Sequence, residues 1–600
     1  MCGLPAGIGK AYEIMKTRCP MPLLLSCLLC FLLSSHAAML TVTSTADSGA
    51  GTLREALTNA ANGDTINFSI TGTITLTNGV LLVTNNVTIL GPGPAGLAVN
   101  GNGNSRVFRA QGGVSATIAG LTITNGKALG DFGGGIYNDH STLTVSNCSL
   151  TGNSSRFGGS IYNDGVGGTA SLSVTDSTIS TNMAGIAGAG IFNNAISGSA
   201  TLTVANTTFI GNFTASNGNG AGIYNDGQSS GSAMLTVVNC TFFANAAYFG
   251  SGGGIYNDAG TLTVSASTFS NNLAYNPGGG GIYNPGGTST VSASTFSGNS
   301  ATSGAGIFSG GSSVGSATLS VGASTFSGNS ASADGGGIFN YGFGGTATVF
   351  VATCTFSTNT AIYGGAIYND GAASSNTTLR VNASTLSGNS ASAGGGGIFN
   401  DASSAGQAIL EIGDTILIRG ASGSNFTNTL GTVRSHGYNL SSDGGGGFLT
   451  ATGDQIHTNA MLGPLQNNGG PTFSHALLAG SPAIDQGKRD AIPSLALNTD
   501  QRGQPRPFDF PSIANASGGD GSDIGAFEAV QPLLSIIASG PNVVLSWPAP
   551  GPVYRLESLT NLAASSNWTF VSGTPTAIAN QFYLTNPANA SSKFYRLIYP

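Results

Sequence analysis

A seven-residue motif built around an isoleucine recurs ten times between residues 133 and 401. It reads GGGIYND at 133–139, and its last copy reads GGGIFND at 395–401. The ten isoleucines, 25 to 32 residues apart, are Ile136, Ile161, Ile191, Ile223, Ile255, Ile282, Ile307, Ile338, Ile367 and Ile398. Self-similarity at a period of this size predicts a solenoid, in which each repeat packs mainly against its two neighbours.

The residues between two copies of the motif have the pattern of short strands. An alternating run such as 142–145 comes first, and a second run such as 207–212 follows it and ends in Phe-x-x-Asn or a close variant. No segment from 130 to 400 spaces its apolar residues as a helix would. Three strands per repeat and no helix predict an all-β fold. We expect a parallel β-helix, in which each strand pairs with its copy one coil away, about 4.8 Å along the axis.

Three residue types recur at fixed places in the repeat and are expected to stack along the axis. The phenylalanines of one slot are Phe209, Phe242, Phe269, Phe296, Phe326 and Phe356. The asparagines three residues after that slot are Asn153, Asn182, Asn212, Asn245, Asn272, Asn299, Asn329, Asn359 and Asn389. Cys148, Cys240 and Cys354 share another slot, three and four coils apart. Because a disulfide needs Cα atoms within about 7 Å, we predict three buried free thiols.

The two motifs, GGAI-like and FxxN-like, alternate once per coil and resemble the repeats of the chlamydial polymorphic outer-membrane proteins. The wider class is the right-handed, pectate-lyase-like β-helix, also called pectin lyase-like. The resemblance covers roughly 130–401. It implies a right-handed solenoid that is displayed on a bacterial surface and serves adhesion. Repeats of this kind specify an architecture and not an activity.

Charge and the N-terminal segment bear on location and partners. Charged residues are 7 % of the chain and the net charge is −7, which excludes the basic face that nucleic acid requires. Residues 1–38 have the pattern of a secretory signal peptide, with Lys16 and Arg18 before an apolar run at 23–33; Met15 is an alternative start. That run is too short for a transmembrane helix. We expect a monomer without a transmembrane span, either secreted or associated with the outer membrane at the cell surface.

The segments that flank the repeats form separate units. Residues 39–125 are expected to hold an N-terminal cap and the first coils, and 126–404 the regular repeats. In the cap, Thr52-Leu-Arg-Glu55 predicts a capping box that opens a helix running to about Ala61. A cap is needed there because the end of a β-helix exposes unpaired strands.

Residues 405–530 are expected to form the last coils and a region with its own motifs. GYNLSSD (437–443), LGPLQNNGGPTFSHALLAGSPAIDQG (462–487), TDQRGQPRP (499–507) and SDIGAFE (522–528) follow in order. The series resembles the choice-of-anchor Q region of secreted bacterial β-helix proteins, which implies a link to the cell surface. Its charged residues, Asp485, Asp500, Arg502, Arg506, Asp523 and Glu528, indicate an ion-paired C-terminal cap or a Ca²⁺ or sugar site. Residues 531–600 resemble fibronectin-like modules and predict a small β-sandwich.

An aspartate ends the isoleucine motif in six of the ten copies. These residues are Asp139, Asp164, Asp226, Asp258, Asp370 and Asp401. Pairs from adjacent coils would bring carboxylates about 5 Å apart, which is the spacing of a retaining glycosidase, and grouped carboxylates also suit Ca²⁺. The aspartate recurs, however, where an active site would need one unusual coil. Solvated corner residues, a Ca²⁺ site and catalysis therefore stay open as interpretations, and no other metal or cofactor is expected.

A tyrosine follows the isoleucine in six copies, at Tyr137, Tyr162, Tyr224, Tyr256, Tyr283 and Tyr368. Facing outward, these rings would form an aromatic strip for neutral sugars; facing inward, they would be core. Apart from His140, the only basic residues between 130 and 401 are Arg156 and Arg380, so a uronate lyase would lack its base. We predict a structural stalk or adhesin without catalytic residues that binds extracellular polysaccharide or a cell-surface partner. The alternative is a polysaccharide lyase or glycoside hydrolase.

Overall fold

The computed structural model describes residues 37–600 except 216, 312–314, 373–374, 404–405, 531–532, 549–553, 562–567, 579–580, 589–592 and 599–600. The predicted signal peptide, 1–38, therefore lies outside the described residues but for its last two. Within the described part of the chain, no helix is both long and apolar enough to span a bilayer.

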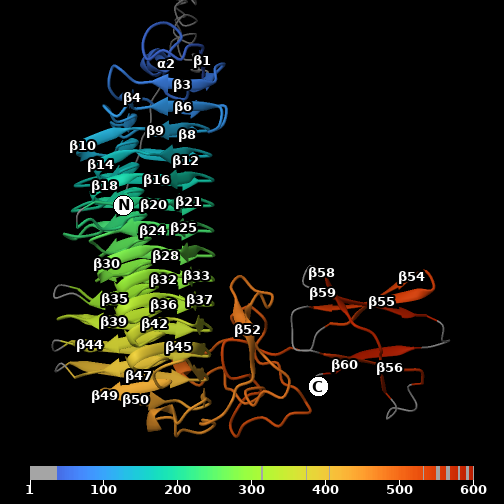
Figure 1. Cartoon of the computed structure of the whole chain (residues 1–600). Coiled ribbons are helices and arrows are strands. Elements are labelled where there is room, and N and C mark those ends of the chain that lie inside the picture. The colour runs from blue at the N-terminus through green and yellow to red at the C-terminus, as the bar shows by residue number, and fades with distance from the viewer. Residues whose placement is uncertain are drawn as a thin grey trace, which may run out of the picture.

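The described chain winds into a parallel β-helix, as predicted (Figure 1). A 15-stranded sheet runs from β1 (Met39–Val42) to β50 (Thr432–Ser435), and a 23-stranded sheet from β3 (Gly72–Thr75) to β51 (Leu440–Ser441). The third sheet has 13 strands, one per coil, so the stack is about 60 Å long at about 4.8 Å per coil.

The 13-stranded sheet contains the isoleucine motifs. Its strands are β4 (Leu81–Val83), β7 (Phe108–Ala110), β11 (Ile136–Asp139), β15 (Ile161–Asp164), β19 (Ile191–Asn194), β23 (Ile223–Asp226), β27 (Ile255–Asp258), β31 (Ile282–Pro285), β35 (Ile307–Gly311), β39 (Ile338–Gly342), β43 (Ile367–Asp370), β46 (Ile398–Asp401) and β49 (Phe426–Thr429). Neighbouring strands pair without slippage, with Ile136 opposite Ile161 and Tyr137 opposite Tyr162. Equivalent residues of successive repeats therefore lie directly above one another.

Most coils contain a fourth strand that the sequence analysis did not predict. In the coil of β11 it is β14 (Ser154–Phe157), which follows β13 (Ser149–Thr151) and pairs with β18 (Met183–Ala187) of the next coil. Such segments are rich in Ser, Thr and Ala and show no clear apolar alternation. Their main chains nevertheless pair from coil to coil, because parallel pairing needs only backbone groups in register.

The predicted stacks of phenylalanine and asparagine fill the lumen. From Phe209 to Phe356, successive rings lie 4.6–4.8 Å apart between centroids and within 5° of parallel. From Asn153 to Asn389, each side-chain Nδ2 donates to Oδ1 of the next coil at 2.8–3.1 Å. The three cysteines are buried and free, as predicted.

In six of the ten motifs, the glycine directly before the isoleucine makes room for a ring of the phenylalanine stack. A Cβ added at Gly222 would lie 3.0 Å from the ring of Phe242, and it would also collide with the carbonyl oxygen of Gly254 in the next coil. The same arrangement recurs at Gly254 beside Phe269. The two sequence motifs are therefore one structural unit, because the glycine of one admits the ring of the other.

The predicted N-terminal helix is α2 (Leu53–Asn59), which ends two residues earlier than expected. Oγ1 of Thr52 accepts a hydrogen bond from the amide of Glu55 at 3.2 Å, and the Glu55 carboxylate accepts one from the amide of Gly51 at 2.6 Å. Leu53 and Leu57 are buried against the first coil. The capping box thus forms, but the Glu55 carboxylate accepts from the amide of Gly51, one residue before the N-cap, instead of from the amide of Thr52 itself.

After β51 the chain turns back and lies along the lower coils, as the orange segment of Figure 1 shows. This region holds β52 (Leu462–Gln466) and β53 (Ser474–Leu477), which are antiparallel. Gln501 bonds to Thr355 at 2.5 Å, and Nε2 of His475 lies 3.1 Å from Oγ of Ser357. The region therefore covers the side of the 23-stranded sheet. Its likeness to a choice-of-anchor Q region stays a prediction, as do the predicted domain boundaries.

The C-terminal strands form two small antiparallel sheets, as expected for 531–600. One contains β54 (Ser535–Ser539), β55 (Asn542–Pro548), β58 (Thr576–Ile578) and β59 (Gln581–Pro587). The other contains β56 (Arg555–Leu559), β57 (Thr569–Phe570) and β60 (Phe594–Ile598). Side chains from both sheets, including Trp547 and Leu556, share one core. The likeness to fibronectin-like modules stays a prediction.

Candidate functional site

The predicted tyrosines and aspartates all lie on the outer face of the 13-stranded sheet. Neighbouring residues of a strand point to opposite faces, so Ile136 and Asn138 point into the lumen and Tyr137 and Asp139 point outward. The inward asparagines form a second amide ladder that the sequence analysis missed. Its hydrogen bonds measure 2.6–2.8 Å, and Ser309 interrupts it at β35.

The outward tyrosines are mostly covered and do not form an open strip. Phenylalanines from the remaining copies complete a row of ten rings with centroids 4.6–5.6 Å apart. Phe132, Phe157 and Ala187 of the fourth strands pack over the first part of the row, where Tyr162 is only 3 % exposed. The row is therefore a second apolar core outside the lumen, and it differs from either arrangement considered for the tyrosines.

Three of the six aspartates accept hydrogen bonds from tyrosines of this row, each from the coil before. The Tyr137 hydroxyl donates to the Asp164 carboxylate of the next coil at 2.6 Å, and Tyr224 donates to Asp258 in the same way. Tyr368 donates to Asp401 at 3.2 Å. In each of these coils the recurring aspartate has a structural partner, which gives a structural reason for its recurrence.

Two aspartates lack this donor because a phenylalanine occupies the slot one coil earlier. Phe192 precedes Asp226, and Phe339 precedes Asp370. Burial raises the pKa of Asp226 to about 6. Burial, together with repulsion from Asp401 and Asp334, raises the pKa of Asp370 to about 7. Both carboxyls are therefore partly protonated near neutral pH.

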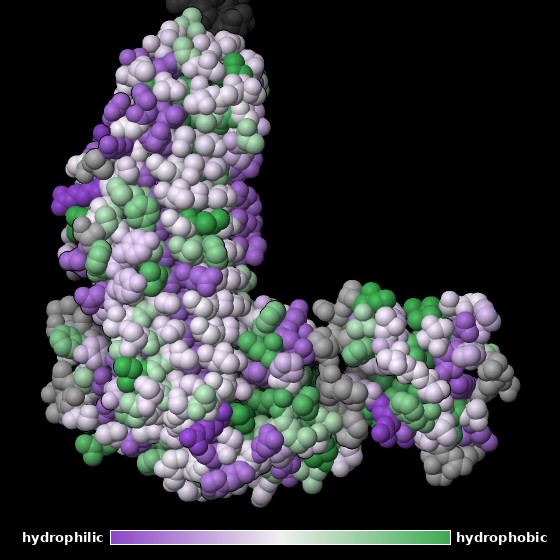
Figure 2. Space-filling model, viewed as in Figure 1, coloured by the Kyte–Doolittle hydropathy of each residue, from purple (hydrophilic) through white to green (hydrophobic). Residues whose placement is uncertain are grey.

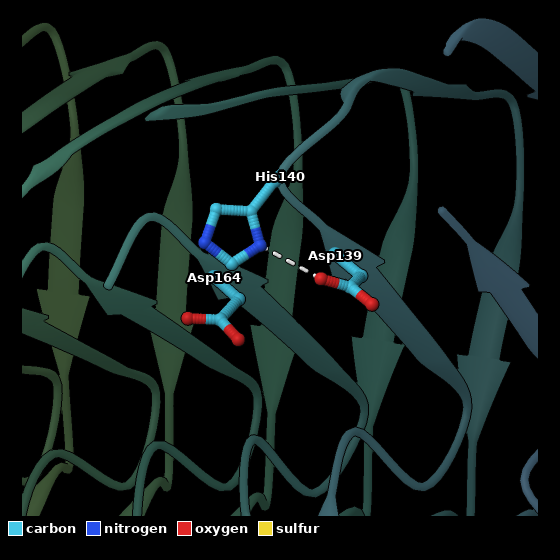
Figure 3. Close-up of side chains that lie close together, drawn as sticks. All are labelled: Asp139, His140 and Asp164. Carbon is cyan, nitrogen blue, oxygen red and sulfur yellow. Dashed lines mark hydrogen bonds and ion pairs between the residues drawn. The ribbon is translucent and has the colours of Figure 1, made fainter. Parts of the chain in front are cut away.

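At the N-terminal end of this face, Asp139, His140 and Asp164 lie close together, and the Asp139 carboxylate points toward the imidazole (Figure 3). One possible ligand atom from each of the three residues lies within 4.8 Å of the other two. Nδ1 of His140 lies 2.7 Å from Asp139, and Nε2 lies 2.9 Å from the carbonyl oxygen of Val166. Arg109 donates to the other oxygen of Asp139 at 2.5 Å. Both imidazole nitrogens face acceptors, so this cluster suits a protonated histidine better than a metal ion.

Sequence reasoning missed Arg109 because it lies before the first full motif. A signal was present, since Phe108-Arg109-Ala110 pairs in register with Ile136-Tyr137-Asn138 and places the arginine in the tyrosine slot. The Arg109 guanidinium lies 5.1 Å from the ring centroid of Tyr137. Although burial opposes it, the hydrogen bonds from Arg109 and His140 lower the pKa of Asp139.

Asp139 is expected to hold the imidazole of His140 in its charged form. The hydrogen bond that His140 donates to Asp139 raises the pKa of His140 above its ordinary value of 6.5. The pair therefore adds stability below about pH 6.5, and this contribution is lost as the pH rises through the raised pKa. Titration of the imidazole by NMR should show the raised value in the native chain and a lower one in Asp139→Asn. An unchanged midpoint in the variant would contradict the assignment.

In the middle of the face, three successive coils lose the aspartate, and a groove opens there. Pro285, Gly310 and Tyr341 occupy its slot in β31, β35 and β39. The groove has a volume of about 490 Å³. Its lining includes Tyr283, Phe308, Phe339, Tyr341, Phe343, Asp334 and Asp370. The motifs IYNP, IFSG and IFNY carried this signal in the sequence, since none of the three ends in aspartate.

Comparisons with known proteins address the repeats. The model of the Chlamydia polymorphic membrane protein repeat matches residues 266–285, 323–341 and 353–370. The chain thus carries Chlamydia polymorphic membrane protein repeats. Each matched segment ends in one of the strands β31, β39 and β43, which border the groove. No curated protein matches the chain.

Two solved structures were found among those that match. One is the catalytic unit of a thermostable GH87 α-1,3-glucanase from Streptomyces thermodiastaticus strain HF3-3, with 15 % identity, 66 % of this chain and 69 % of that chain covered, and a TM-score of 0.24. The other is a family 28 exopolygalacturonase from Yersinia enterocolitica, with 9 % identity, coverage of 67 % and 78 %, and a TM-score of 0.23. At these TM-scores the likeness carries no argument about function.

Proposed function

We propose that this chain is a non-catalytic β-helix at the bacterial cell surface, a stalk and adhesin that binds extracellular polysaccharide or a cell-surface partner. The observation that carries the proposal is the double bracing of the rod. Ladders of asparagine and phenylalanine join the coils inside, and the rings with their Tyr–Asp bonds join them outside. Such bracing suits a rigid spacer, because each coil is tied to its neighbour on both sides of the sheet.

The surface and the repeats support the same proposal. Chlamydia polymorphic membrane protein repeats favour a surface protein of the adhesin type. Figure 2 shows much of the coil stack in pale colours, which mark residues of intermediate hydropathy. A surface with few charges attracts neither nucleic acid nor strongly anionic polymers. Secretion, association with the outer membrane and the monomeric state are parts of this proposal.

The test is to incubate purified 39–600 with neutral and acidic polysaccharides and with whole cells. Both bound protein and newly formed reducing or unsaturated ends are measured. We expect binding to at least one surface without new chain ends, because most of the recurring carboxylates are engaged by the protein itself. Cleavage of any polymer would overturn the proposal, as would the absence of binding to every polysaccharide and cell.

A further inference from the structure

The groove at β31–β43 is walled by a fan of aromatic rings. The Tyr341 ring stacks on Phe339 at 5.2 Å and on Phe343 at 5.9 Å, and it meets the edge of Phe308 at 6.0 Å. Phe343 is 56 % exposed, so its large apolar ring stands in solvent beside the groove. Pro277 and Pro285 complete the apolar part of the lining. Rings that are free on one face offer negative quadrupole potential to a ligand.

The groove is acidic and has no cation of its own. Asp334, at the end of β38 (Ser330–Asp334), and Asp370 both line it, and no Lys, Arg or His is among its described lining residues. By contrast, Arg109 pairs with Asp139 in the N-terminal cluster of the same face. Among the described residues, the side-chain hydrogen bond that Asp334 accepts comes from the Ser303 hydroxyl, at 3.2 Å. These two carboxyls therefore lie beside apolar rings without an opposite charge.

The raised pKa values of the acidic side chains in the groove agree with this lack of a counter-charge. Burial raises the pKa of Asp334, and burial with repulsion from Asp401 and Asp334 raises that of Asp370 to about 7. Burial and the nearby Asp370 and Asp334 also raise the pKa of Tyr341. A positively charged ligand would lower the pKa values of Asp334 and Asp370, because it would favour their charged carboxylates.

We propose that this groove is a receptor for an organic cation, namely an ammonium or guanidinium group such as a lysine or arginine side chain of a surface partner. Aromatic faces and unpaired carboxylates are together complementary to such a group. The volume of about 490 Å³ lies within the range of ordinary ligand sites. An anionic sugar would meet repulsion, and a neutral sugar would leave both carboxylates without a counter-charge. The inference rests on the proposed adhesin function and names the chemistry of its partner.

Binding of a cation should weaken as Asp370 takes up a proton. The titratable groups that face Asp370 are Asp334 on β38, Asp401 on β46, Tyr341 on β39 and Tyr368 on β43. The tyrosines stay neutral in the working range, since their pKa values are raised. Affinity should therefore be higher at pH 8 than at pH 6, and it should fall with salt.

The test uses purified 39–600 and Nα-acetyl-lysine methylamide as the probe, followed by NMR or calorimetric titration. The matched neutral probe is the same compound acetylated on its Nε atom. We expect saturable binding of the cationic probe only. Asp370→Asn, which keeps the shape of the side chain, should weaken binding about tenfold, and Phe343→Ala about threefold or more. Asp176→Asn, an equal charge change at an exposed corner elsewhere, is the control that should bind normally.

Each outcome decides the proposal. Asp370→Asn should fold, because the native carboxyl is already partly neutral at pH 7, and its circular dichroism and melting curve check this. Equal binding of the neutral probe, preferential binding of an uncharged oligosaccharide, or no saturable binding of the cation would overturn the inference. The proposed function is tested separately. Cleavage of a polymer would contradict it even if the cationic probe bound. Adhesion without binding of the cationic probe would contradict only the cation site.

Discussion

Replacing Arg506 by methionine should lower the free energy of unfolding of the C-terminal region by about 3–5 kcal/mol. Arg506 is fully buried; its Nη2 lies 2.7 Å from Asp414, and its Nε lies 3.3 Å from Glu528. It also donates to the carbonyl oxygen of Gly525 at 2.8 Å. Asp523 is buried in the same cluster. The methionine would leave carboxyls in the interior without a counter-charge, and a buried charge that loses its partner is strongly destabilising.

The measurement is hydrogen exchange or limited proteolysis of residues 405–530, because a solenoid need not unfold in one step. Arg489→Met is the matched control: this arginine is 41 % exposed and lies 3.4 Å from Asp520. An exposed ion pair is worth less than about 1 kcal/mol, so the control should change little. Equal protection in both variants would show that the buried pairs do not hold this region.

Acid should partly restore the Arg506→Met variant. Burial raises the pKa of Glu528 to about 7 and that of Asp414 well above its ordinary value. The folded state then binds protons that the unfolded state releases above about pH 4.5, so stability falls as the pH rises from there through about 7. Removing the guanidinium should steepen this dependence. A variant that lost as much protection at pH 5 as at pH 8 would contradict the electrostatic explanation.

This cluster also shows what could not be predicted from the sequence. The concentration of charge at Asp500, Arg502, Arg506 and Glu528 was visible, and it indicated either an ion-paired cap or a Ca²⁺ or sugar site. Asp414 was not included, because it lies 92 residues before Arg506, in the corner between β47 (Gln407–Gly413) and β48 (Ile416–Arg419) of a coil that otherwise looks regular. Contacts between neighbouring coils recur with the period of the repeat and can be read from it. Contacts between a coil and the returning tail have no period.

The candidate site divides in the same way. Alternation along a strand puts each tyrosine on the same face as the residue two places later, but whether that face is outward or inward was left open by the sequence. Whether the rings are covered depends on the fourth strands, whose residues lack an alternating pattern. Asp334, which completes the groove, lies at the end of such a strand. The groove could not be predicted from the sequence, because the fold brings Asp334 of β38 and Asp370 of β43 together to line it.

Phe242→Ala should cost about 3–5 kcal/mol, because it removes a large ring from the middle of the lumen. Phe242 is fully buried between Phe209 and Phe269, and its centroid lies 4.6 Å from each of theirs. Gly222 already lies against the ring and cannot fill the cavity. Phe243, the next residue of β25 (Thr241–Phe243), points outward and is 42 % exposed. Phe243→Ala should change stability by less than about 0.5 kcal/mol.

The effect of Phe242→Ala should also be local along the rod, because each coil is stabilised by its two neighbours. Thermal melting should become broader than that of the native chain, as the coils on either side of β25 become less well coupled. Hydrogen exchange should speed up first in the coils of Phe209, Phe242 and Phe269 and spread outward from them. If the two alanine variants melted alike, or if protection fell evenly over the whole stack, the ring stack would not be what couples the coils. The rod would then owe its rigidity to the asparagine ladders, the outer row of rings with its Tyr–Asp bonds, and the backbone pairing.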